Sequence, residues 1–164
     1  MEERMTIDEI GFKLMGEGYS PVVDDVDWFR VTNDEEDYYV YVGHLPDVFV
    51  EKRIMTNCFE YKNESKLLCC AMDTLNSLMS HVKVFMGASD DTLTFRIGMT
   101  PEDRGQFSRG LKLCLEALEK AESEFGHACS VMVRQYEKNE ADSLMDQYSD
   151  PSPDSPLLQG KISS

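Results

Sequence analysis

Apolar residues near the start of the chain recur at helical spacing. Ile7, Ile10 and Leu14 fall on one face of a helix. The stretch "TIDE" just before them matches a capping box, in which the Thr6 hydroxyl accepts a backbone N–H and the Glu9 side chain reaches back. Two glycines soon afterwards stop the pattern. The sequence therefore predicts a short amphipathic helix that begins at Thr6.

Three runs rich in β-formers come next, at residues 26–31, 38–42 and 47–61. In "VDWFRV" the alternation places Trp28 and Arg30 on one face and Phe29 and Val31 on the other. The polar links "NDEED" and "GHLPD" between the runs are short, and the first is typical of a hairpin turn. Short links require antiparallel neighbours, so we expect three antiparallel strands.

The second half of the chain alternates between helical and strand patterns. Helical spacing follows Asn63, strand patterns cover residues 80–86 and 92–98, and "GASDD" turns the chain between them. A long helix is then expected, with Thr100 as its N-cap and Pro101 in its first position. Its apolar stripe is spaced 4, 3, 4, 3, 4 and consists of Phe107, Leu111, Cys114, Leu118, Ala121 and Phe125.

The order of elements is α-β-β-β-α-β-β-α, which predicts an α+β fold with a five-stranded antiparallel sheet and helices packed on one face. We expect this domain to cover residues 1–125. Residues 126–145 form a helical extension, and whether they continue the third helix is open. Residues 146–164, rich in proline and serine, are expected to be a flexible tail.

The charge of the chain narrows the choice of partners. Sixteen basic and 31 acidic residues give a net charge of -15, which would repel nucleic acid and an anionic membrane. Such a surface suits basic or unfolded partners, and it also keeps a protein soluble. The first residues show no apolar leader, and the five cysteines lack the spacing of a disulfide framework. We therefore expect a cytoplasmic protein with reduced thiols.

No catalytic, cofactor-binding or metal-binding residue stands out. The three histidines, His44, His81 and His127, lack zinc-ligand spacing, so we expect no metal and no cofactor. Pro101 and the two acidic residues after it, Glu102 and Asp103, argue against a phosphate site at the start of the long helix. We expect a protein that is not an enzyme. A site assembled in space from scattered acids and histidines stays open as an alternative.

Aromatic residues on the predicted strands are the most suggestive feature. If the helices cover one face of the sheet, the opposite face is left open, and aromatic side chains there would form a patch rimmed with acids. We therefore predict a partner-binding surface; its residues are Tyr39, Tyr41, Phe49 and Tyr61. Three alternatives stay open, namely a solvated sheet, packing under the tail, and a small-ligand sensor on the same face.

The passages "DWFRV", "YYVYV" and "TLTFRIGMTPEDRGQF", in this order of elements and in an acidic chain, resemble the YbjN-like domains and the class I type III secretion chaperones, which share a similar fold. The resemblance covers residues 5–125. It implies a homodimer built through a helix and an edge strand, and a protein-binding role as chaperone, adaptor or regulator. It supplies no catalytic residues. The chain after Phe125 departs from the secretion chaperones, which puts a secretion role in doubt.

Overall fold

A computed structural model describes residues 5–55, 65–87 and 92–149. The chain divides into two compact units, residues 1–128 and 129–164. Within the described ranges the elements are α1 (Ile7–Gly16), β1 (Val22–Asp25), β2 (Trp28–Asn33), β3 (Glu36–His44), β4 (Asp47–Met55), α2 (Ser65–Leu78), β5 (Val82–Met86), β6 (Thr92–Met99) and α3 (Arg104–Ser149). Their α+β class agrees with the prediction.

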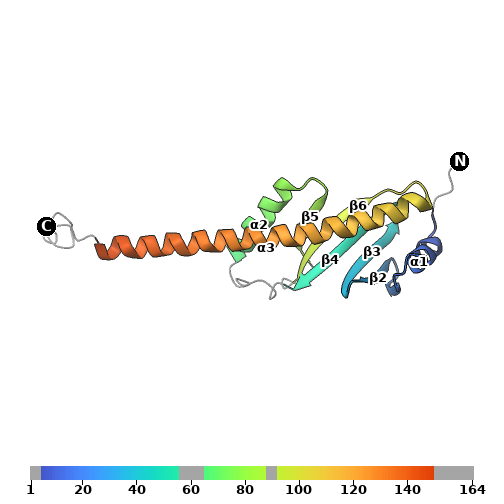
Figure 1. The fold of residues 1–164 in the computed structure, drawn as a ribbon, viewed down its shortest axis with the longest axis horizontal. Coiled ribbons are helices and arrows are strands. Elements are labelled where there is room, and N and C mark those ends of the chain that lie inside the picture. Colours follow the sequence, from blue (N-terminus) through green and yellow to red (C-terminus); the bar gives the residue numbers. More distant parts are fainter. Residues whose placement is uncertain (1–4, 56–64, 88–91, 150–164) are drawn as a thin grey trace. The chain divides into compact units, whose positions relative to one another are not determined.

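The strands form one antiparallel sheet in the order β1-β2-β3-β4-β6-β5 (Figure 1). The sheet has six strands, so the predicted five was wrong. The additional strand is β1, which pairs with β2 and places Val23 opposite Phe29. All four of its residues are exposed. An exposed strand of four residues has no alternation of buried and exposed positions, so the hydrophobic pattern of the sequence did not predict it.

The predicted hairpin between β2 and β3 is confirmed. Asn33 lies opposite Glu36, and only Asp34 and Glu35 lie between the strands. Both have positive φ angles, 51° and 66°. Two such residues in succession match the twist that a two-residue hairpin loop requires. The other short link is also a turn: β3 continues to His44 and β4 begins at Asp47, with a cis peptide bond between Leu45 and Pro46.

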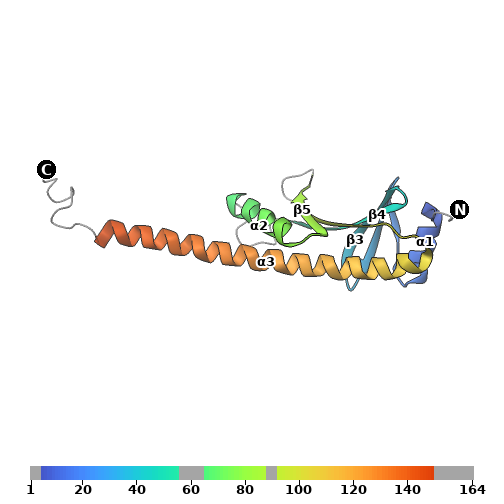
Figure 2. The same ribbon diagram turned by 90° about the horizontal axis from the view of Figure 1, so that it is seen from above.

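The core lies between α1, α3 and one face of the sheet. Figure 2 shows α3 running along one side of the strands. The Phe95 ring of β6 meets the Phe125 ring of α3 edge to face, with centroids 5.6 Å apart. Gly11 of α1 faces Phe29, so closely that an added Cβ would lie 3.3 Å from the ring. The capping box of α1 is present as predicted, since the Thr6 hydroxyl accepts the Glu9 N–H at 3.3 Å.

The helix α3 confirms the predicted apolar stripe, because all six of its residues are buried; they are Phe107, Leu111, Cys114, Leu118, Ala121 and Phe125. Its start was placed too early. The helix begins at Arg104, and the Asp103 carboxylate accepts the Gln106 N–H at 2.8 Å as its N-cap. Thr100 does not cap the helix because its hydroxyl donates to Asp47, at 2.7 Å, and ties this segment to β4.

The helix α2 lies along β5, which is a border strand of the sheet. The amide group of Asn76 accepts the Val84 N–H at 2.8 Å and donates to the Val84 carbonyl at 2.9 Å. Helix α2 thereby satisfies backbone groups of β5 that a further strand would otherwise use. Its apolar residues Leu68, Ala71 and Leu75 are buried.

Residues 129–149 belong to the second unit and lie within α3, whose bounds also include the predicted extension at 126–145. Several apolar side chains in this segment are exposed: Val131, Tyr136, Leu144 and Met145. Most of the predicted tail, residues 150–164, lies outside the described residues. No helix in the described ranges is long and apolar enough to cross a membrane.

Candidate functional site

The face of the sheet opposite the helices carries a row of aromatic rings. Trp28, Tyr41 and Phe49 lie opposite one another on β2, β3 and β4. Ring centroids are 4.8 Å apart for the first pair and 6.3 Å for the second. On β6 the next position in this aromatic row is Gly98, where an added Cβ would lie 3.1 Å from the Phe49 ring. Glycine therefore leaves room for the ring, and the row forms a continuous apolar strip across three strands.

A second row runs parallel to the aromatic row and is mainly charged. The cross-strand pairs join five strands in the order β2, β3, β4, β6 and β5; the residues of this charged row are Arg30, Tyr39, Glu51, Arg96 and Lys83. Residues directly opposite each other on neighbouring strands have Cβ atoms about 5 Å apart, so their side chains are close enough to interact. The sheet therefore brings together charges that are up to 66 positions apart in the sequence.

The carboxylate of Glu51 organises the centre of this face. Glu51 is only 2% exposed and accepts from Arg96 Nε at 2.5 Å and from Arg53 Nε at 3.2 Å. The guanidinium of Arg53 lies 3.9 Å from the centre of the Tyr39 ring, and that of Arg96 lies 5.0 Å from the Phe85 ring. Arginine stacks favourably on aromatic faces, so both guanidinium groups are held by a carboxylate and by rings.

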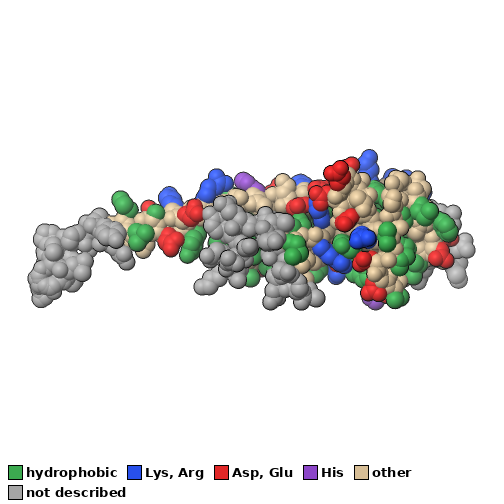
Figure 3. All heavy atoms as spheres, turned by 90° about the horizontal axis from the view of Figure 1, so that it is seen from below, with side chains coloured by type: hydrophobic (Ala, Val, Ile, Leu, Met, Phe, Trp, Pro, Cys, Tyr) green, Lys and Arg blue, Asp and Glu red, His purple; other side chains and the backbone are tan. Residues whose placement is uncertain are grey.

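Three of the four residues predicted for partner binding lie on this face. Tyr39, Tyr41 and Phe49 are partly exposed and come from adjacent strands, while Tyr61 lies outside the described residues. The aromatic and charged rows, together with Arg53 and Phe85, are called the open face below. No described helix covers it. Figure 3 views the protein from below relative to Figure 1, and on the surface seen there basic, acidic and apolar side chains lie side by side.

Sequence reasoning placed Arg30 beside Trp28 but missed the role of Arg53 and Arg96 on the open face, because it expected acids around the aromatic residues. A signal was present in the run "EKR" at residues 51–53, where three charges interrupt a strand pattern. Strand alternation places Glu51 and Arg53 on one face and Lys52 on the other. What the sequence did not supply was the register, which sets Glu51 beside Arg96 from a strand 45 positions away.

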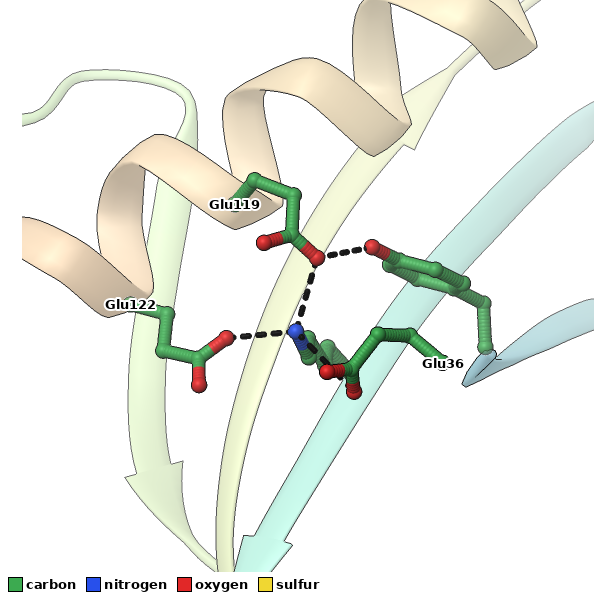
Figure 4. Close-up of polar contacts among 5 residues, drawn as sticks. Glu36, Glu119 and Glu122 are labelled. Atoms are coloured by element: carbon green, nitrogen blue, oxygen red, sulfur yellow. Dashed lines mark hydrogen bonds and ion pairs between the residues drawn. The ribbon is translucent and has the colours of Figure 1, made fainter. Parts of the chain in front are cut away.

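A second polar cluster lies on the opposite side of the same strand, where Lys52 contacts two glutamates of α3, Glu119 and Glu122 (Figure 4). The Lys52 side chain is 4% exposed, and its Nζ lies 2.5 Å from Glu122, 2.7 Å from Glu119 and 3.4 Å from Glu36. The Tyr38 hydroxyl donates to Glu119 as well. These contacts join β3, β4 and α3 through one ammonium group.

Electrostatics fixes the protonation states in this Lys52 cluster. Burial alone would lower the pKa of Lys52, but its hydrogen bonds to Glu119 and Glu122 outweigh burial and raise it above the ordinary 10.5. Burial would raise the pKa of Glu119, yet the hydrogen bonds from Lys52 and Tyr38 lower it. Burial and the bond to Glu119 raise the pKa of Tyr38. A lysine held protonated is a poor nucleophile or base, so these pKa shifts favour a role in joining elements over one in proton transfer.

Comparison with known proteins supports the fold but assigns no function. No protein-family model matches the chain, and no curated protein matches it. The crystal structure of YbjN, a candidate transcription regulator from E. coli, superposes with a TM-score of 0.53. The sequence identity is 13%, and the match covers 80% of this chain and 94% of YbjN. The chain has a YbjN-like fold.

A crystal structure of an uncharacterized protein from Methanothermobacter thermautotrophicus gives a TM-score of 0.49 at 10% identity, over 73% of this chain and 96% of that one. The YbjN-like part of the predicted resemblance is confirmed, whereas the likeness to secretion chaperones stays a prediction. Because identity to YbjN is so low, the YbjN-like fold alone assigns no residue a role.

Proposed function

We propose that this chain is a non-catalytic protein-binding module of the chaperone or adaptor type, which works as a homodimer in the cytoplasm and binds its partner on the open face. The observation that carries the proposal is the aromatic row of Trp28, Tyr41 and Phe49 on a face that no described helix covers. Tryptophan, tyrosine and arginine dominate the binding energy of protein interfaces, and this face presents all three.

The construction of the open face also supports a binding role. The Arg53 guanidinium lies 3.9 Å from the Tyr39 ring centre and 4.8 Å from the Trp28 ring centre. Because Glu51 anchors this guanidinium, the side chain loses little additional freedom when a partner arrives. The four described cysteines (Cys69, Cys70, Cys114 and Cys129) are free thiols, which supports a cytoplasmic location.

A site-specific photo-crosslinking experiment tests the proposal. The photoreactive amino acid p-benzoylphenylalanine would replace Tyr41 on the open face or, as a matched control, Leu113, which is 64% exposed on α3. After irradiation in the cells that make the protein, we expect a discrete adduct with one partner protein from position 41. The same adduct should be absent or several-fold weaker from position 113.

The identity of the adduct decides the outcome. A partner that crosslinks from position 41, and that no longer does so when Trp28→Ala is added, would support binding on the open face. Adducts that form equally from both positions, or only from position 113, would contradict it. Melting temperatures of the variants, compared with the parent chain, show whether each remains folded.

A further inference from the structure

We propose that the open face binds an acidic, extended segment of the partner protein, whose carboxylates pair with the basic side chains of the charged row. This inference rests on the function proposed above and names the chemical class of the partner. An acidic partner is the opposite of what the net charge suggests, since a chain with a net charge of -15 would be expected to attract basic partners.

The charge balance of the open face is the reverse of that of the whole chain. The charged row contains Arg30, Arg96 and Lys83 but only one acid, Glu51. The row beside it adds one base and one acid; its residues are Thr32, Asp37, Arg53, Thr94 and Phe85. Two adjacent rows therefore carry four basic and two acidic side chains, whereas the chain has 16 basic and 31 acidic residues.

Among the described residues, the positive charge of the charged row is only partly neutralised. Glu51 is a single carboxylate that pairs with two guanidinium groups, those of Arg53 and Arg96. Within the described ranges, neither Arg30 nor Lys83 forms an ion pair, and the Lys83 ammonium donates only to the Asn76 carbonyl at 3.4 Å. Within this part of the chain, Arg30, Lys83 and one of the two guanidinium charges beside Glu51 have no carboxylate of their own, which favours binding of an anion.

The spacing of these charges suits an extended peptide. Neighbouring strands lie about 4.8 Å apart. Arg30 on β2 and Arg96 on β6 are three strands apart, so their Cα atoms are separated by about 14 Å. An extended peptide advances about 3.4 Å per residue, so four residues cover the same distance. Carboxylates at positions i and i+4 of such a peptide would reach Arg30 and Arg96, while apolar side chains could rest on the aromatic row.

A nucleic acid is the less suitable anion. It carries a phosphate on every nucleotide, so its approach to a chain with a net charge of -15 is opposed by repulsion beyond the open face. A peptide with a few carboxylates gains the local attraction at a smaller long-range cost. We therefore propose an acidic protein segment as the ligand of the open face, and an oligonucleotide serves as the competing probe in the test.

Peptide binding tests the inference directly. The probe is a blocked octapeptide of alternating glutamate and valine, and its uncharged control has glutamine in place of glutamate. Both would be titrated into the full-length protein and followed by calorimetry and by amide chemical shifts. We expect the glutamate peptide to bind at least about tenfold more tightly than the control, to weaken as salt is added, and to shift amides of β2, β4 and β6.

Two charge-matched double variants test the site. Arg30→Gln with Lys83→Gln removes two charges from the open face, and Arg109→Gln with Lys112→Gln removes two from exposed positions of α3. We expect the first pair to weaken binding of the glutamate peptide by about tenfold and the second pair to change it by less than about twofold. Unchanged melting temperatures would show that both double variants fold.

Several outcomes would overturn the inference. These are equal binding of the glutamine peptide, equal losses in the two double variants, no binding at all, or tighter binding of a single-stranded octanucleotide. The crosslinking experiment separates this failure from that of the proposed function. If Tyr41 still marks a discrete partner while the acidic peptide fails, only the acidic chemistry is wrong, and if both experiments fail, neither proposal stands.

Discussion

A buried lysine surrounded by three glutamates is the most unusual arrangement at the scale of single residues. Lys52 contacts Glu36, Glu119 and Glu122, which are 55%, 50% and 33% exposed. Solvent reaches the carboxylates more easily than the ammonium group, so removing the lysine leaves three like charges that can still be hydrated. The cluster therefore favours one docking position of α3 on the sheet without making folding depend on it entirely.

The Lys52 cluster predicts a pH dependence of stability. Because folding lowers the pKa of Glu119 below its ordinary 4.5, its contribution is fully present above that pH and is lost as the pH falls through the folded pKa. At pH 7 we expect Glu119→Gln to cost about 1 kcal/mol, since half of the side chain is exposed. Urea unfolding should show this cost shrinking below about pH 4.5.

A matched variant on the same helix controls for helix propensity. Glu116 is exposed on α3, and Glu116→Gln should leave the unfolding free energy nearly unchanged between pH 7 and the acid range. If both variants show the same pH profile, the bond from Lys52 to Glu119 does not stabilise the protein. Lys52 behaves in the opposite way: because folding raises its pKa, its contribution is fully present below its ordinary pKa of 10.5 and is lost as the pH rises through the folded pKa.

Alternation along a strand predicted single-residue positions well and their partners poorly. It predicted that Trp28 and Arg30 share a face and, on the condition that one face stays uncovered, that Tyr39 and Tyr41 lie on it, as the structure has them. It did not predict that Glu51 would meet Arg96. Which residues lie opposite depends on the register between β4 and β6, and the chain between them leaves that register undetermined from local pattern.

At the scale of elements, α3 shows that a regular apolar pattern predicts the buried face of a helix better than its first residue. Its apolar stripe is buried as predicted, but its first turn is not where Thr100 and Pro101 suggested. Asp103 is as good an N-cap residue as threonine, and a contact with Asp47 on another strand engages Thr100 instead. Such a tertiary contact is not visible in a local sequence.

The α3 stripe supports a stability prediction. Leu118 is fully buried, and Leu118→Asp would place an unpaired carboxylate in the core, so we expect a loss of about 3 to 5 kcal/mol in the unfolding free energy. Leu113, five positions away, is 64% exposed, and Leu113→Asp should change it by less than about 0.5 kcal/mol. Equal urea midpoints for the two variants would contradict the assignment of the buried face of α3.

At the scale of the whole molecule, the order of helices and strands was sufficient to predict an α+β fold with an antiparallel sheet and a YbjN-like arrangement. The count of strands was not predictable, because β1 is short and wholly exposed. Its pairing with β2 is favoured by the sheet that β2 already belongs to, and not by apolar burial of its own residues.

The proposed homodimer is the prediction that belongs to this scale. Light scattering should give a mass of twice the 18.7 kDa of one chain. If the interface includes the free border strand β1, Val23→Lys should shift the protein toward monomer, because a lysine on a strand edge opposes pairing. A mass of one chain over about a hundredfold range of concentration would remove the dimer from the proposal.

The hydrogen bonds of Asn76 to Val84 make the two borders of the sheet unequal. At β5 the side-chain amide of Asn76 bonds to the N–H and the carbonyl of Val84, as a neighbouring strand would, so that border is partly capped. At β1, in the part of the chain that the structure describes, no comparable substitute exists. We therefore expect this sheet to extend at one border. A strand added in evolution, or a strand of a misfolded second copy, would pair beside Val23 and not beside Val84.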